Sequence, residues 1–92
     1  MGNKTFFEFL EEEFQVLASQ LQTNLAKIAS DTSYDNPDKI GAVSTAGKQL
    51  ARCQAVLQNL LAESRKDSEF RERTTLYKLQ LEALKAEYQR HQ

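Results

Sequence analysis

The side chains best suited to nucleophilic chemistry in this chain are its one cysteine, Cys53, and its one histidine, His91. A thiol beside an imidazole base would form a nucleophilic pair, because the base removes the thiol proton. His91, however, lies one residue from the end of the sequence, where chain termini fray. Cys53 falls beside an apolar stripe, which favours a small buried hydrophobic residue. A lone cysteine also allows neither an internal disulfide nor a cysteine-based metal site.

Carboxylates are the second group that could carry out chemistry. The acidic run Glu11, Glu12 and Glu13 is the densest, and further glutamates occur at Glu63, Glu69 and Glu72. Acid–base catalysis or metal binding would require a positioned histidine, a metal-spaced cluster or a glycine-rich phosphate loop, and none accompanies them. Near the start of a helix, an acidic run is typical of a solvated face that suits the helix dipole. We therefore predict a non-enzymatic protein without cofactor or metal.

The elements that would position these side chains are indicated by apolar residues at alternating three- and four-residue steps. This spacing draws one apolar stripe along a helix and occurs in three stretches. The stripes consist of Phe7, Leu10, Phe14, Leu17, Leu21 and Ile28, with the polar Asn24 at one position and Leu25 beside it; of Ile40, Val43, Gly47, Leu50, Gln54, Leu57 and Leu61; and of Phe70, Thr74, Tyr77, Leu81, Leu84 and Tyr88. They predict helices over approximately 4–30, 37–65 and 68–90.

The predicted helix boundaries carry capping signals. Asn3 or Thr5 can cap the first helix, and Glu8 completes a capping-box spacing with Thr5. Asn36 before Pro37 supplies the next start, and Asp67 or Ser68 can cap the third helix. Short connections force neighbouring helices to run antiparallel. The sequence therefore predicts an all-α fold, a single antiparallel up-down-up three-helix bundle over residues 1–92.

Charge and hydropathy narrow the class of partner. The formal net charge is −1, from 12 basic and 13 acidic residues, without the concentrated basic footprint that nucleic-acid binding needs. No apolar run approaches the roughly 20 residues that span a bilayer. We therefore expect a cytoplasmic protein that binds other proteins, does not bind nucleic acid and does not itself insert into a membrane. As an isolated domain, the chain is expected to be monomeric.

Secondary apolar positions flank each stripe, and two interpretations of them stay open. They either complete the core, because each helix of a three-helix bundle touches two others, or form a groove for a partner. These positions are Phe6, Phe9 and Val16; Cys53, Val56 and Leu60; and Leu76, Leu79 and Ala83. For a partner surface, the candidate residues are Leu60, Leu76, Leu79 and the loop residue Tyr34.

The stretch from Gln54 to Tyr88 resembles the second and third helices of the N-terminal, Habc-like three-helix domain of Vti-type Qb-SNARE proteins. The residues that carry the resemblance are Ala55, Leu57, Leu61, Glu63 and Arg65 in the second predicted helix, and Tyr77, Lys78, Leu81, Leu84, Lys85 and Glu87 in the third. The opening from Phe7 to Leu17 is similar to the aromatic and acidic start of that family. The resemblance thus covers most of the chain.

The resemblance implies the regulatory N-terminal domain of a SNARE, on the cytosolic face of Golgi or endosomal membranes. Such a domain would bind trafficking adaptors, such as ENTH-domain proteins, or other SNAREs during vesicle transport and membrane fusion. Two alternatives stay open. One is a small helical co-chaperone of a secretion system, whose secondary stripes would be partner surface. The other is a coiled-coil subunit of a larger assembly.

Overall fold

The computed structural model describes residues 5–30 and 37–91, and within them the chain forms a three-helix bundle. Helix α1 spans Phe6–Ser30, α2 spans Pro37–Ser64 and α3 spans Ser68–Gln89. The predicted ranges agree with these bounds to within two residues. The described part of the chain contains no strand, which confirms the predicted all-α class.

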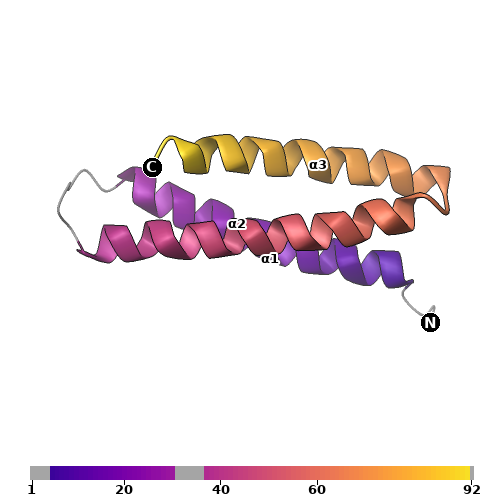
Figure 1. The fold of residues 1–92 in the computed structure, drawn as a ribbon, viewed down its shortest axis with the longest axis horizontal. Coiled ribbons are helices and arrows are strands. Elements are labelled where there is room, and N and C mark those ends of the chain that lie inside the picture. The colour runs from indigo at the N-terminus through magenta and orange to yellow at the C-terminus, as the bar shows by residue number, and fades with distance from the viewer. Residues whose placement is uncertain (1–4, 31–36, 92) are drawn as a thin grey trace.

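The helices run up, down and up along a body of 48 × 26 × 17 Å (Figure 1). Helix α1 begins at the end of the bundle where α2 passes into α3, and α3 finishes at the opposite end, near the C-terminus of α1 (Figure 1). Helix α2 packs against both of the others, whereas α1 and α3 touch each other less extensively. The predicted antiparallel up-down-up arrangement is therefore confirmed.

Two of the predicted capping signals are formed. The Thr5 Oγ1 accepts a hydrogen bond from the Glu8 amide at 3.1 Å, and the Glu8 carboxylate accepts one from the Thr5 amide at 3.4 Å, a reciprocal capping box. Asp67 caps α3, with its Oδ1 accepting from the Glu69 amide at 2.9 Å. The predicted caps Asn3 and Asn36 lie outside the described residues.

The core follows the predicted stripes of α1 and α3. On α1 every apolar stripe position is buried except Leu17, which is half-buried. On α3 the stripe is buried at Thr74, Leu81 and Leu84 and half-buried at its other positions. The polar position Asn24 is also used, because its Nδ2 donates to the Ala42 carbonyl oxygen at 2.8 Å and ties α1 to α2. For the two outer helices α1 and α3, the spacing of a single apolar stripe is therefore enough to predict which side of the helix is buried.

Helix α2 departs from the predicted stripe. Cys53, Val56 and Leu60, which the sequence places beside the stripe, are buried in the core. Ile40, placed on the stripe, is 66% exposed, and that prediction is wrong. The first difference arises because a helix between two neighbours must bury a wider arc. The second arises because Ile40 lies about a third of a turn round α2 from the buried Ala46, on a side that neither neighbouring helix covers.

The secondary positions of α1 are also exposed. Phe6, Phe9 and Val16 are 60%, 57% and 56% exposed, so they do not complete the core. Phe9 and Val16 lie on the opposite side of α1 from Phe14, which has no exposed surface, and Phe6 lies about a quarter turn round the helix from Phe14. The core-completing interpretation therefore holds for α2 and fails for α1, because α1 is an outer helix with one covered face.

The two glycines of α2 have different surroundings. A Cβ added at Gly47 would lie 2.8 Å from the Tyr88 hydroxyl oxygen, whereas one added at Gly41 would meet nothing within 4 Å. Gly47 therefore has a packing reason: the phenol end of an α3 tyrosine lies against the α2 backbone. Gly41 has no such reason.

Gly41→Ala is therefore expected to raise the free energy of unfolding by about 0.5–1 kcal/mol, because alanine restricts the unfolded chain and favours the helix. Gly47→Ala carries the same propensity gain but must displace the Tyr88 hydroxyl, so it should stabilise less or destabilise. Urea unfolding of both variants would check this. An equal gain at the two positions would contradict the packing role of Gly47.

Candidate partner-binding surface

The four predicted partner-binding residues differ in their exposure to solvent. Leu76 is 67% exposed and Leu79 is 57% exposed, as a contact surface requires. Leu60 has no exposed surface, and its place among the candidates is corrected: α2 is covered by helices on two sides, and Leu60 belongs to that core. Tyr34 lies outside the described residues. The candidate surface therefore lies on α3.

The exposed leucines belong to a continuous outer face of α3. Leu76, Leu79, Ala83 and Ala86 follow one another at steps of three, four and three residues, and all four are exposed. At 3.6 residues per turn these steps keep one side of the helix. We call these four residues the outer α3 face.

The opposite side of α3 faces the core. Thr74, Leu81 and Leu84 are buried there, and none shares a helix face with Leu76 or Leu79. A surface helix usually carries one apolar stripe and one polar side. Helix α3 carries two apolar faces, and the fold uses only one of them.

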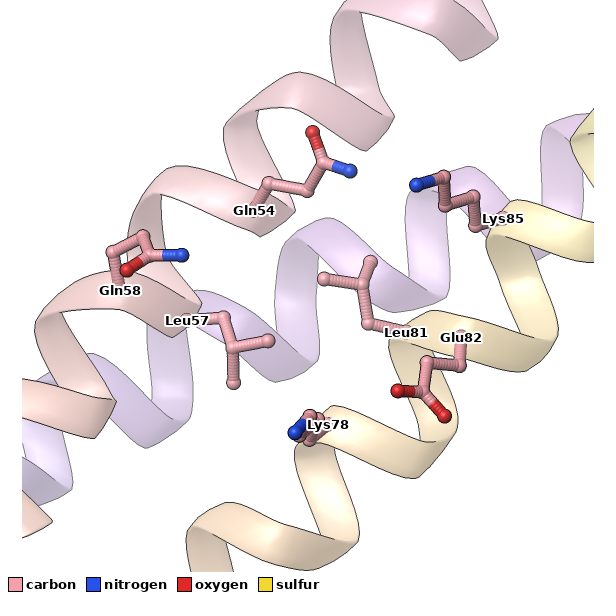
Figure 2. Close-up of a pocket in the computed structure, with 7 residues that line it drawn as sticks. All are labelled: Gln54, Leu57, Gln58, Lys78, Leu81, Glu82 and Lys85. Carbon is pink, nitrogen blue, oxygen red and sulfur yellow. The ribbon is translucent and has the colours of Figure 1, made fainter.

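A second feature is a groove between α2 and α3, of about 280 Å³. Its lining includes the apolar side chains of Leu57 and Leu81, which project toward the space between the two helices (Figure 2). Polar side chains from both helices line the rest: Gln54, Gln58, Lys78, Glu82 and Lys85. The groove therefore has an apolar floor and a polar rim.

A partly buried polar cluster joins α1 to α3. The Arg73 guanidinium binds the Glu11 carboxylate through two of its nitrogens, with Nε 3.0 Å from Oε2. The Tyr77 hydroxyl donates to the same Oε2 at 2.6 Å and accepts from the Gln15 side-chain amide at 3.1 Å. The Phe7 and Phe70 rings stack beside the cluster, with their centroids 4.1 Å apart. These contacts fix α3 against α1.

The sequence interpretation missed this cluster. It treated Glu11 as part of a solvated acidic run, but Glu11 is buried, with 7% exposure. Glu11 follows Phe7 by four residues and precedes Phe14 by three, so it shares the core side of α1 with both. Together with a tyrosine on the α3 stripe, whose hydroxyl needs a partner when buried, that spacing was the signal. Among the described residues, no buried polar side-chain atom lacks a hydrogen-bond partner, and we assign the cluster no chemistry.

The cluster should make stability sensitive to alkaline pH. Burial, together with the Glu11 hydrogen bond and charge, raises the pKa of Tyr77 above its ordinary value. The folded state therefore favours the neutral phenol. This contribution to the free energy of unfolding is fully present below about pH 10, which is the pKa of tyrosine in the unfolded chain. It is lost as pH rises through the higher folded pKa.

Tyr77→Phe is expected to be less stable than wild type at pH 8, by about 1 kcal/mol for the lost hydrogen bond. The difference in free energy of unfolding between the two proteins should narrow above about pH 10. Only the wild type then loses the stabilisation that comes from the neutral Tyr77 hydroxyl. Urea unfolding of both proteins at a series of pH values from pH 8 to above pH 10 measures this difference. The lysines also titrate in this range, but they do so in both proteins and therefore cancel in the comparison. A gap that stays constant with pH would contradict the role of Tyr77.

The remaining chemically notable residues do not assemble into a site. Cys53 is fully buried, and burial raises the pKa of its thiol, which disfavours the reactive thiolate. His91 lies just beyond the end of α3. Within residues 5–30 and 37–91, no group of three His, Cys, Asp or Glu side chains could hold a metal ion. In the same part of the chain, no helix has the length and apolarity to cross a membrane.

The fold and surface define a three-helix bundle with an uncovered apolar face on its third helix. Comparison with protein-family models, with curated proteins and with solved structures finds no match. Function must therefore be argued from the surface itself.

Proposed function

We propose that this chain is a non-enzymatic protein-interaction domain that binds a partner helix on the outer α3 face. The observation that carries the proposal is the exposure of Leu76 and Leu79, on a helix whose other side already packs in the core. Large apolar side chains that follow helical spacing and stay uncovered are typical of a surface for an amphipathic helix.

The partner class follows from the resemblance of residues 54–88 to Vti-type SNARE domains. We propose a regulatory N-terminal domain that binds ENTH-type adaptors or other SNAREs on the cytosolic side of Golgi or endosomal membranes. The three-helix architecture supports this proposal, because such domains are bundles of this kind by the same resemblance.

The source transcript downstream of the Gln92 codon tests the family. Further heptads with a central glutamine, followed by roughly 20 apolar residues, would support a SNARE. A stop codon directly after Gln92 would remove that family and leave a stand-alone interaction module.

The surface is tested by titrating purified ENTH domains into the isotope-labelled chain and following its amide resonances. We expect shifts centred on Leu76 and Leu79, and a loss of affinity of at least about tenfold in Leu79→Ser, from one buried leucine. The matched control is Val16→Ser, another exposed apolar position but on α1. Binding that Val16→Ser weakens as much as Leu79→Ser would contradict the outer α3 face.

A second candidate function rests on the exposed aromatic residues of α1. Phe6 and Phe9 are more than half exposed, as in a small co-chaperone that masks an aggregation-prone partner. Phe6→Ser/Phe9→Ser should then abolish protection of an aggregating client measured by light scattering, whereas Leu79→Ser should not. The reverse result would favour the adaptor-binding domain.

A further inference from the structure

The outer α3 face continues at both ends into charged residues with the same spacing. Glu72 lies four residues before Leu76, and Arg90 lies four residues after Ala86. Arg90 keeps helical backbone angles, with φ −66° and ψ −21°, so the stripe runs beyond the last residue of α3. Glu72, Leu76, Leu79, Ala83, Ala86 and Arg90 therefore form one row with alternating four- and three-residue steps, the spacing of a coiled-coil seam.

The row is complementary to itself when one copy is reversed. A two-fold axis level with Leu81 places Leu76 opposite Ala86 of the second copy and Leu79 opposite its Ala83. Large residues then meet small ones in every apolar layer, which lets two helices approach closely without a cavity. A parallel pairing would set leucine against leucine and alanine against alanine, and would leave gaps at the alanine layers.

Charge favours the same arrangement. The reversed pairing places Glu72 opposite Arg90 of the second copy at each end, so two ion pairs close the seam. A parallel pairing would place each of these charges opposite its own copy. In the reversed pairing Glu82, beside the axis, lies close to Glu82 of the second copy. Lys78 and Lys85 lie within one turn of Glu82 on the same helix, where their positive charges offset this repulsion.

We propose that the outer α3 face binds a second copy of this chain, antiparallel and in this register. Pairing along Glu72–Arg90 covers about 27 Å of helix and roughly 1,000 Å² in total, near the lower limit for a specific interface. The dimer is therefore weak: the chain is monomeric when dilute and pairs at high local concentration. The inference goes beyond the proposed function, because it uses the same face but gives it a different occupant.

The test is sedimentation equilibrium of the chain from about 10 µM to 1 mM, the range in which a small interface associates. Wild type should form dimers. Glu72→Arg and Arg90→Glu should each weaken dimerisation at least about tenfold, because each replaces two ion pairs by two repulsions. The double variant Glu72→Arg/Arg90→Glu restores both pairs and should return to within about threefold of wild type.

Both charged residues are exposed, so their variants should unfold like wild type, which thermal denaturation checks. A wild type that stays monomeric at the highest concentration would overturn the pairing, as would a double variant that stays as weak as the single variants. ENTH binding, measured at dilute concentration, separates the two proposals. Adaptor binding without dimers refutes only the pairing, and dimers without adaptor binding refute only the adaptor function.

Discussion

Phe14→Ala is expected to lower the free energy of unfolding by about 3–5 kcal/mol, the largest effect of any single change considered for this chain. Phe14 has no exposed surface, and its ring packs against Tyr77 at 5.1 Å between centroids. It therefore lies where α1 meets α3. Truncation removes the buried ring, leaves a cavity and loosens a neighbour of the polar cluster. Equilibrium unfolding in urea measures the loss.

Phe9→Ala is the matched control, with the same substitution on the same helix five residues earlier. Phe9 is 57% exposed, so the change should alter stability by less than about 0.5 kcal/mol. The contrast tests the orientation of α1 about its axis. Comparable losses at the two positions would show that α1 is rotated from the described arrangement.

Arg73→Ala is expected to lower the free energy of unfolding by about 2–3 kcal/mol. The variant leaves the buried Glu11 carboxylate without its cation, which is the costly way to break an ion pair. This loss is no larger than the smallest losses typical of breaking a fully buried ion pair, about 3 kcal/mol. The reason is that 39% of the Arg73 side-chain surface remains in solvent, which weakens the pair. Urea unfolding at pH 7 measures it.

Arg71→Ala is the control for this second prediction, because Arg71 is an exposed arginine on the same helix, two residues away. It should change stability by less than about 0.5 kcal/mol. The double variant Glu11→Leu/Arg73→Leu should recover part of the Arg73→Ala loss, since apolar replacement removes the unpaired charge. If the double variant recovers none of the stability lost in Arg73→Ala, Arg73 acts through its packing on the Phe7 ring rather than through Glu11.

The sequence predicted the elements because their signals are local. The Thr5 and Asp67 caps act on amides within three residues. The core stripes of α1 and α3 could be read by period alone, because each outer helix buries one face against the bundle. The close contact at Gly47 fits the general rule that glycine inside a helix is costly without a packing reason.

The candidate surface was predicted in part. Leu76 and Leu79 were among the predicted partner-binding residues, and they are exposed. Leu60 could not be separated from them by spacing. Whether a flanking apolar residue is buried depends on how many neighbours its helix has, and a single sequence does not state which helix lies in the middle.

By itself, then, the sequence determined three amphipathic helices, two of their caps and an antiparallel order, all of which follow from contacts close along the chain. Only the tertiary structure decided that α2 lies between the other two, that Ile40 is left uncovered and that Glu11 is buried. The tertiary structure also decided that Arg73 and Tyr77 reach Glu11 across more than 60 residues of sequence. The physical reason is that burial and charge pairing depend on which faces meet in space, and periodicity fixes only the face that each helix offers.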